Sequence, residues 1–174
     1  MTRRIAGEKE VAQLITRLAG TIRRANKDTK DVAFVGIKRR GVPLARRIAA
    51  RLSGTVRIPV GAIDITLYRD DLKMVAETPI VRGSEIDFDI NGRTLVLVDD
   101  VIFTGRTIRA ALTELLDFGR PRCIQLAVLI DRGHRELPIQ PDFTGRAIRT
   151  RREDLVDIYF KETDGRDGVF LTRK

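Results

Sequence analysis

Apolar residues in the first part of the chain switch between helical spacing and continuous runs. They recur every three or four positions over residues 7–26, which predicts an amphipathic helix. A continuous apolar run predicts a buried strand over 31–37, and helical spacing returns over 42–52, where Pro43 suits a first helical turn. A further run at 58–68 is typical of a strand. Helices and strands therefore alternate from the start of the chain.

The alternation resumes after a long polar segment, residues 69–92, which has no strong period. The pattern predicts a buried strand over 94–98, a helix within 104–119 and another buried strand over 123–130. Strands separated by helices favour parallel pairing, because parallel neighbours need a crossover connection. We therefore predict an α/β fold, with a central, mainly parallel sheet flanked by helices.

The C-terminal part follows a different pattern. Residues 131–154 look irregular, whereas residues 154–173 contain two strand-like pieces around Asp-Gly turn signals, which predicts a terminal hairpin. The chain has 174 residues, with no internal repeat and no low-complexity tract. We therefore predict a single domain over residues 1–174.

Charge and cysteine content narrow the kinds of partner. Lys and Arg number 33 against 24 Asp and Glu, and the formal net charge of +9 attracts polyanions such as phosphorylated metabolites or nucleic acid. The single cysteine, Cys123, excludes an internal disulfide and a multi-cysteine metal site. We expect neither a signal peptide nor a membrane span. A cytoplasmic protein with an anionic ligand fits these features.

The segment VLVDDVIFTGRT, residues 96–107, carries the clearest chemistry. Asp99 and Asp100 end a predicted buried strand, and ligands of parallel sheets bind beyond the carboxyl ends of strands. Carboxylates there can accept hydrogen bonds from two neighbouring hydroxyls or face hydrated Mg²⁺. The small residues at 104–107 let backbone N–H groups close around a phosphate at a helix start. A ribose 5-phosphate satisfies both halves, whereas an ordinary cap and turn would explain only part of the set.

These residues are similar to the phosphoribosyl pyrophosphate signature of type I phosphoribosyltransferases. Three further segments extend the resemblance: DITLYRDDL (64–72), GRPRCIQLAVLIDRGHRELPI (119–139) and DFTGR (142–146). Together they resemble the PyrR family, which pairs uracil phosphoribosyltransferase activity with regulation of pyrimidine-biosynthesis genes, in many members by binding leader mRNA. The signature alone indicates only the superfamily, and the flanking segments are more specific. The resemblance is strongest over residues 31–146.

The resemblance implies a type I phosphoribosyltransferase fold and a reaction. A small hood would comprise about residues 131–160 plus an N-terminal part, with Arg132 near pyrophosphate or base and Val156 against the base. A flexible lid loop would lie at about residues 68–84. Uracil and phosphoribosyl pyrophosphate would give UMP and pyrophosphate with Mg²⁺, and UMP or UTP would act as effectors. The family also implies a homodimer or a higher homo-oligomer. Catalysis would rest on positioning, exclusion of water and neutralisation of the leaving group.

The resemblance also implies roles for individual residues. Asp99 and Asp100 would face the ribose or its Mg²⁺, directly or through water, and form the catalytic set together with Arg69. Arg69 and Arg82 belong to the lid loop, although a mobile loop without catalytic duty is the alternative. The expected phosphoribosyl pyrophosphate or nucleotide contacts are Arg39, Arg40, Arg82, Asp99, Asp100, Val101, Ile102, Phe103, Thr104, Gly105, Arg106, Thr107, Arg132 and Val156.

The leaving group needs cations, and GIKRRG, residues 36–41, resembles the family's pyrophosphate loop. Gly36 and Gly41 would free the backbone, while Arg39 and Arg40 would meet pyrophosphate oxygens. A solvated basic turn is the alternative for this segment, because runs of charge usually lie at the surface.

A second basic group could bind RNA through salt-sensitive phosphate contacts. The candidates are Thr16, His134, Arg135, Arg146 and Arg149. The chain departs from the family pattern in two regions linked with RNA regulation, since Gly20 stands at a His position and Arg149-Thr150-Arg151 replaces a typical PTS. These arginines could instead fill a dimer interface or bind anions nonspecifically, and a lone His134 could be structural.

Three functions stay open from the sequence. The first is a uracil phosphoribosyltransferase, and the second is a nucleotide-sensing RNA-binding regulator with little catalysis. The two can coexist, because one pocket can hold an effector that biases an RNA-binding face. The third is a phosphoribosyltransferase for another base, such as a purine or orotate.

Overall fold

Two sheets and four helices make up the part of the chain that the structure describes. The computed structural model describes residues 1–27, 30–54, 57–65 and 83–174. The helices are α1 (Glu8–Ala25), α2 (Gly41–Leu52), α3 (Arg106–Asp117) and α4 (Lys161–Asp164). The strands are β1 (Thr2–Ala6), β2 (Val32–Ile37), β3 (Val60–Ile63), β4 (Thr94–Ile102), β5 (Cys123–Asp131), β6 (Phe143–Ala147), β7 (Leu155–Tyr159) and β8 (Gly168–Thr172). None of these helices is both long and apolar enough to cross a membrane.

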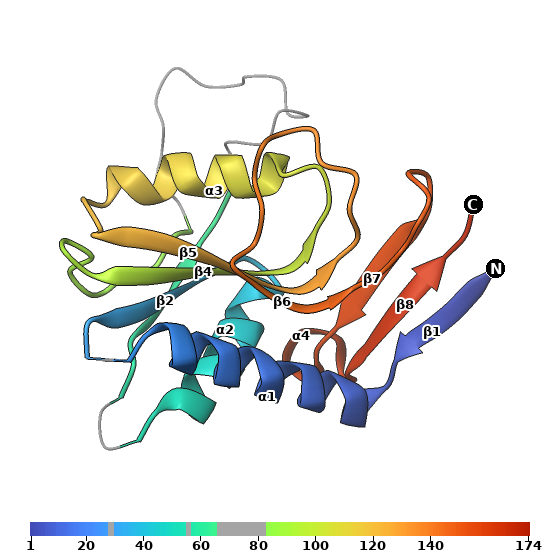
Figure 1. Ribbon diagram of the computed structural model, residues 1–174, viewed down its shortest axis with the longest axis horizontal. Helices are drawn as coiled ribbons and strands as arrows, with labels where there is room; N and C mark the ends of the chain where they lie inside the picture. The colour runs from blue at the N-terminus through green and yellow to red at the C-terminus, as the bar shows by residue number, and fades with distance from the viewer. Residues whose placement is uncertain (28–29, 55–56, 66–82) are drawn as a thin grey trace.

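The central sheet has five strands in the order β3-β2-β4-β5-β6, and every pairing is parallel. Helix α3 covers one face of this sheet, while α1 and α2 cover the other (Figure 1). The predicted α/β fold with a central, mainly parallel sheet is therefore confirmed. Because β4 lies in the middle, its carboxyl end is flanked by strands on both sides.

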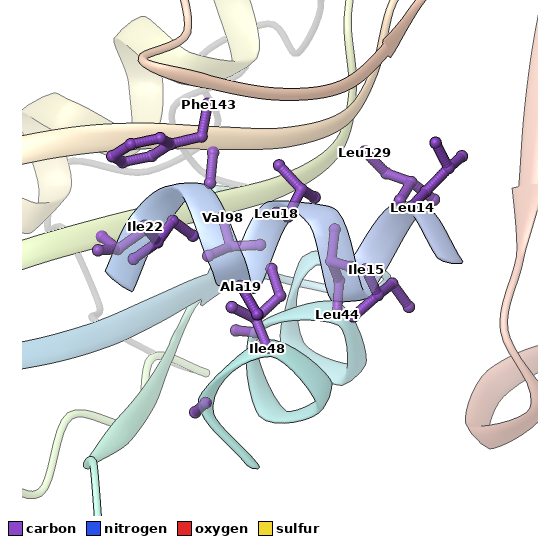
Figure 2. Close-up of a cluster of buried hydrophobic side chains, with 14 of the residues drawn as sticks. Leu14, Ile15, Leu18, Ala19, Ile22, Leu44, Ile48, Val98, Leu129 and Phe143 are labelled. Atoms are coloured by element: carbon purple, nitrogen blue, oxygen red, sulfur yellow. The ribbon is translucent and has the colours of Figure 1, made fainter. Parts of the chain in front are cut away.

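The residues of β4 alternate between two apolar cores. Leu95 and Leu97 pack on the α3 side, whereas Val96 and Val98 pack on the side of α1 and α2. Figure 2 shows the second core, where the apolar stripe of α1 lies against α2 and the sheet. Each fully buried side chain of this size contributes about 1.5–3 kcal/mol. The prediction that this strand ends at residue 98 is wrong, because β4 stays paired with β5 through the charged pair as far as Ile102. The strand that carries the two aspartates is thus held firmly on both faces.

The second sheet has three strands in the order β1-β8-β7 and lies at one end of the molecule, beside both termini (Figure 1). The predicted terminal hairpin is confirmed, because β7 and β8 pair antiparallel, with α4 in the connection between them. β1 adds to the other edge of β8. Its mostly exposed residues gave no apolar pattern to predict a strand from.

The expectation that residues 131–154 are irregular is wrong for β6. This strand pairs parallel with β5 and buries Phe143 and Gly145. A Cβ at Gly145 would lie 2.5 Å from the carbonyl oxygen of Leu129, so close backbone packing explains the glycine. Short length and mixed polarity hid the strand from the sequence pattern.

Two glycines allow the start of α2 to pack closely, Gly41 against β4 and Gly36 against the end of β2. A Cβ at Gly41 would lie 2.3 Å from the carbonyl oxygen of Val98, and one at Gly36 would lie 2.5 Å from the Cα of Val42. These glycines therefore serve close approach of two backbone segments, in addition to the freedom expected from sequence. The contact places the turn at residues 38–40 directly beside Asp99.

Gly41→Ala should destabilise the protein by about 1–3 kcal/mol, because the added methyl group must push α2 away from β4. Gly54→Ala is the matched control, since a Cβ at Gly54 meets no atom within 4 Å. Urea denaturation of both variants at one protein concentration measures the difference. Equal stability of the two variants would contradict the tight contact at Gly41.

Candidate functional site

A cavity of about 340 Å³ lies where the carboxyl ends of β2 and β4 meet α4. Its lining residues are Lys38, Arg39, Arg40, Asp99, Asp100, Thr163 and Asp164. The structure thus brings together four residues that the sequence placed in the site: the two arginines after β2 and the two aspartates of β4. A larger cavity of about 760 Å³ lies between α2 and the residues leading into β3, but none of the predicted site residues lines it.

The two aspartates form a pair of like charges, in which Asp99 is buried and Asp100 is half-buried. Asp99 is 7% exposed, and its Oδ1 accepts a hydrogen bond from the backbone N–H of Asp100 at 2.9 Å. The Oδ1 of Asp100 accepts one from the N–H of Val101, also at 2.9 Å. Burial raises the pKa of both carboxyl groups, and the charge of Asp100 raises the pKa of Asp99 further. Such a pair is suited to bind a cation or hydroxyl donors.

Three cations face this pair from the turn after β2. The Lys38 Nζ pairs with Glu85 at 2.9 Å, and Arg40 pairs with Asp164 at 3.0 Å. Arg39 is exposed and makes no ion pair with any described residue, and the peptide bond before it is cis. The positive charge of Arg40 lowers the pKa of Asp100 against the effect of burial. One edge of the cavity is therefore cationic, as a phosphate-bearing leaving group requires.

The turn from β4 into α3 is shaped for an anion. Gly105 precedes α3 with a φ of 93°, a left-handed conformation that glycine adopts without strain. The first turn of α3 contains no acidic residue, and its N-cap residue, Gly105, makes no side-chain capping hydrogen bond. The backbone N–H of Arg106 donates to the Thr104 hydroxyl oxygen at 3.4 Å, and the carbonyl oxygen of Thr104 accepts hydrogen bonds from the backbone of Glu136 and Leu137, which holds the turn in place. A helix N-terminus without acidic residues fits the predicted phosphate loop.

Phe103, in the same turn, is covered by residues that follow β5. The Arg132 guanidinium lies 4.1 Å from the centre of its ring, and the His134 ring meets it edge to face. Arg132 is 6% exposed and donates to the carbonyl oxygens of Arg151 and Arg152, at 2.9 and 3.3 Å. Burial lowers the pKa of Arg132, and its Nε has no partner among the described residues. Arg132 thus holds two loops together through Nη2, while its buried Nε stays unpartnered among the described residues.

The structure places the other predicted ligand contacts less centrally. The ion pair between Arg106 and Glu136, at 2.8 Å, fixes one side of the phosphate turn, and Glu136 also pairs with Arg152. Val156 is half-buried on β7 and packs against a core, and it is not among the residues that line the cavity. Val101 and Ile102 are the last residues of β4, Thr107 lies in the first turn of α3, and Ile102 is buried in the core on the α3 side. Arg69, Arg82 and most of the expected lid loop lie outside the described residues.

Two of the RNA candidates have structural partners. The Arg135 side chain is 12% exposed, pairs with Asp131 at 2.6 Å and donates to the carbonyl oxygens of Phe103 and Ile139. His134 has a φ of 63°, and its Nε2 lies 2.8 Å from the carbonyl oxygen of Thr150. These contacts favour the structural alternative for both residues.

The remaining RNA candidates are more accessible. Arg149 is exposed, and Arg146 is half-buried with one N–H donated to the carbonyl oxygen of Ile5 at 3.2 Å. Thr16 is exposed on α1, where its hydroxyl donates to the carbonyl oxygen of Ala12 at 3.0 Å. Of the five, Arg149 is the residue most open to a partner.

Sequence reasoning missed Thr163 and Asp164 as site residues. Both residues belong to α4, which connects β7 to β8 in the three-stranded sheet and is remote from β4 in sequence. The only signal there was the Asp164-Gly165 turn, and Gly165 indeed ends α4 in a left-handed conformation. A turn signal does not reveal which distant side chains the turn will meet.

Asp99→Asn should stabilise the protein without ligand at neutral pH. The substitution removes a buried carboxyl whose raised pKa means that folding favours its protonated form. The wild type therefore loses stability relative to the variant as the pH rises from the unfolded-state pKa, about 3.9, through the higher folded-state pKa. The gap is about 1.4 kcal/mol for each pH unit between the two pKa values. Urea denaturation from about pH 4 to about pH 8 measures it.

Asp89→Asn is the control for this experiment. Asp89 is exposed, and hydrogen bonds from Asn91 lower its pKa, so no stabilisation should grow with pH in that variant. A gap for Asp99→Asn that stays flat or shrinks between acid and neutral pH would contradict the buried, charge-coupled pair.

Comparison with known proteins identifies the family of this site. Residues 2–155 match the family described as "Phosphoribosyl transferase domain". Bifunctional protein PyrR from Roseiflexus sp. (strain RS-1) is 56% identical over 174 residues, which cover 98% of this chain and 95% of the relative. Bifunctional protein PyrR from Acetivibrio thermocellus is 52% identical over 170 residues, covering 97% and 92%.

Solved structures agree on the fold. A hypoxanthine phosphoribosyltransferase from Trypanosoma cruzi superposes with a TM-score of 0.75 at 19% identity, covering 98% of this chain and 94% of that chain. One from Staphylococcus aureus has a TM-score of 0.74 at 18% identity, covering 99% and 92%. The expected type I phosphoribosyltransferase fold is confirmed. The chain, whose aspartate pair and cationic turn line one cavity, belongs to the PyrR family of phosphoribosyltransferases.

Proposed function

We propose that the protein transfers a phosphoribosyl group from phosphoribosyl pyrophosphate to uracil, giving UMP and pyrophosphate. The observation that carries the proposal is the 340 Å³ cavity, which joins two buried carboxylates to a cationic turn. Beside it stands a helix N-terminus without an acidic residue in its first turn. Uracil as the base rests on membership of the PyrR family, in which relatives are named bifunctional.

In this proposal, each part of the site binds one part of the substrate. Asp99 and Asp100 accept hydrogen bonds from the ribose hydroxyls, while residues 104–107 surround the 5′-phosphate. The pyrophosphate lies against Arg39 and Arg40. The C1–oxygen bond of the ribose breaks and its electron pair leaves with pyrophosphate. A ring nitrogen of uracil bonds to C1 and gives up its proton to water or to the leaving pyrophosphate. The cations stabilise the charge that develops on the leaving group.

Mg²⁺ fits the donor set at the aspartate pair. The described residues contain no group of three or more His, Cys, Asp or Glu that could hold a metal by itself. Mg²⁺ is commonly held by one or two carboxylates together with substrate oxygens, which is what Asp99 and Asp100 offer. The raised pKa of both carboxyl groups indicates that the nearby cations do not fully balance the pair. When bound with the substrate, the ion would supply further charge neutralisation for pyrophosphate.

The resemblance to the family supports further parts of this proposal. Arg69 and Arg82, from the lid loop, would approach pyrophosphate when the loop closes and excludes water. Val156 and the Nε of Arg132 would contact the nucleotide from the hood. A single domain, a cytoplasmic location and a homodimer or higher homo-oligomer belong to the same proposal.

A second function, regulation through leader mRNA, is favoured by one surface feature. Arg149, Arg151 and Arg152 are exposed in the segment between β6 and β7. The backbone of residues 151 and 152 is held by Arg132, which stacks on the ring of Phe103 in the nucleotide turn. A uridine nucleotide bound at that turn would therefore affect, through Arg132, the position of the segment whose exposed arginines would bind RNA phosphates. This basic segment supports uridine-nucleotide-dependent RNA binding.

Incubation with uracil, phosphoribosyl pyrophosphate and Mg²⁺ should produce UMP, whereas hypoxanthine and orotate should yield far less nucleotide. Replacing both Asp99 and Asp100 by Asn should lower kcat by about a hundredfold or more, because ribose and Mg²⁺ contacts are lost. Chromatography of the nucleotide products measures both effects, and Asp89→Asn, at an exposed carboxylate, should retain full activity. Turnover that survives the double replacement would contradict the assignment of the ribose site.

Binding to the leader mRNA of a pyrimidine operon should depend on Arg149 and Arg151. Replacing both by Ala should reduce the slope of log affinity against log salt by about two, since each phosphate contact contributes about one. Arg120→Ala, at an exposed arginine before β5, should leave the slope unchanged. Equal affinity for the leader and a scrambled RNA would exclude specific regulation and leave only nonspecific attraction.

A further inference from the structure

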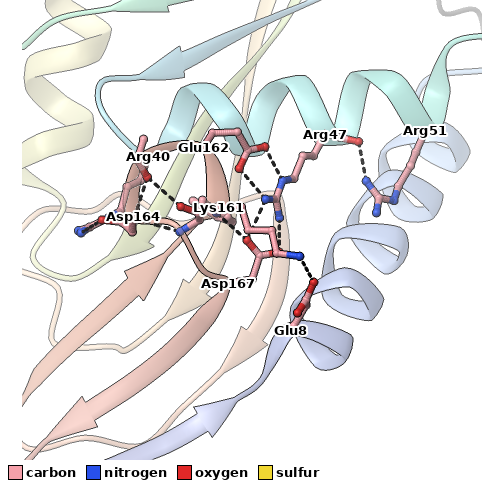
Figure 3. A network of polar contacts seen from close by, with 10 residues as sticks. Glu8, Arg40, Arg47, Arg51, Lys161, Glu162, Asp164 and Asp167 are labelled. Carbon is pink, nitrogen blue, oxygen red and sulfur yellow. Dashed lines mark hydrogen bonds and ion pairs between the residues drawn. The ribbon is translucent and has the colours of Figure 1, made fainter.

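The α4 side of the cavity holds Arg40 through a two-point contact. Arg40 Nε donates to Asp164 Oδ2 at 3.2 Å, and Arg40 Nη2 donates to Asp164 Oδ1 at 3.0 Å (Figure 3). The Arg40 guanidinium also lies 5.3 Å from the centre of the Tyr159 ring. The side chain of Arg40 is 34% exposed and that of Asp164 is 18% exposed, so water screens this ion pair less than an open surface pair. The Arg40 guanidinium is thus oriented by Asp164 along one edge and by the Tyr159 ring on one face.

A guanidinium has five N–H donors and two edges that can each meet a pair of oxygens. Asp164 uses the edge formed by Nε and one N–H of Nη2. The edge formed by Nη1 and Nη2 donates to no described residue. Because Arg40 lines the cavity beside Asp99 and Asp100, this open edge is available to a ligand there.

Arg47, which lies on α2, provides an internal comparison for Arg40, in the turn before α2. Arg47 pairs with Glu162 at 2.5 Å and with Asp167 at 2.7 Å (Figure 3). Both arginines are therefore held by acidic residues of the α4 region. Arg47, however, is not among the residues that line the cavity, whereas Arg40 is. Of the ion pairs that Arg40 and Arg47 make with the α4 region, the Asp164–Arg40 pair is the one at the cavity.

We propose that Asp164 is a positioning residue for the phosphoribosyl transfer, which holds one edge of Arg40 so that the other edge meets the pyrophosphate leaving group. This inference rests on the proposed function, because it takes pyrophosphate as the ligand of Arg40. An arginine whose rotamer is already fixed loses less conformational freedom on binding. Hydrogen bonds from Arg40 hold the pKa of Asp164 well below its usual range, so the contact persists through the working pH range.

The opposite effect is also physically possible and gives the opposite result. If Asp164 competed with pyrophosphate for Arg40, removing its charge would strengthen pyrophosphate binding. The free second edge of Arg40 argues against competition, since both oxygens of Asp164 contact the first edge.

The test compares Asp164→Asn with Glu162→Gln, which weakens the equivalent contact of Arg47 and leaves Arg40 untouched. We expect Asp164→Asn to raise the KM for phosphoribosyl pyrophosphate, and the Kd for Mg²⁺-pyrophosphate by calorimetry, about tenfold. The KM for uracil should change by less than about twofold, because Asp164 acts on the leaving group. Glu162→Gln should match the wild type in all three values. A general loosening of α4 would affect both variants and both substrates.

Two further variants show whether Asp164 acts through Arg40. Arg40→Lys cannot make the two-point contact, so adding Asp164→Asn to it should cause little further loss. Asp164→Glu keeps the charge and displaces the carboxylate, and it should also raise the KM for phosphoribosyl pyrophosphate. This variant serves as the test if Asp164→Asn does not fold.

Each outcome bears on the proposal. Additive losses in the double variant, unchanged constants in Asp164→Asn, or tighter pyrophosphate binding would overturn the positioning role and leave the proposed function standing. A wild-type protein that forms no UMP and binds no pyrophosphate would overturn the proposed function, and the positioning role with it. The positioning role would be supported if Asp164→Asn selectively raises the KM for phosphoribosyl pyrophosphate and the Kd for Mg²⁺-pyrophosphate, and Glu162→Gln raises neither.

Discussion

Two carboxyl groups at the buried end of β4 impose the constraint that the rest of the site has to meet. Neighbouring carboxylates in a place with little water are destabilising, and burial raises the pKa of both Asp99 and Asp100. Backbone N–H groups of Asp100 and Val101 offset part of this cost, and Arg40 acts on Asp100. The remaining imbalance favours a cation or a diol. Ligand affinity and the instability of the empty site therefore have the same origin.

The cations reach this pair through contacts between distant parts of the chain. Gly41 allows the start of α2 to touch the backbone of β4, which sets the turn after β2 beside Asp99. Asp164, in the C-terminal part, then fixes the guanidinium of Arg40 at that turn. The aspartates, the turn and α4 thus depend on one another, although each lies on a different element. Rigid elements on both apolar faces of β4 keep the arrangement in register.

Local patterns predicted the parts of the fold that have a strong hydrophobic period. The strand that carries Asp99, the helix after Gly105 and the terminal hairpin all follow from spacing and turn residues, although β4 extends to Ile102, beyond its predicted end. β1 escaped prediction because its residues are mostly exposed, and β6 because it is short and mixed in polarity. In the site, too, residues with a strong local pattern could be predicted and residues without one could not. The aspartates and arginines were visible as motifs, but Asp164 required knowledge of which turn lies against α2. The structural partners of Arg135 likewise depend on its tertiary setting.

The fold accounts for phosphoribosyl chemistry but not for the choice of base. Hypoxanthine phosphoribosyltransferases with 18–19% identity share this fold at TM-scores of 0.74–0.75. The central sheet with its β4–α3 turn is therefore compatible with a purine as well as a pyrimidine. We therefore propose that the base is selected outside the central sheet, by the segments after β5, where Arg132 and His134 contact Phe103. In this proposal, phosphate and ribose contacts fix where the reaction occurs, and the C-terminal segments select the base.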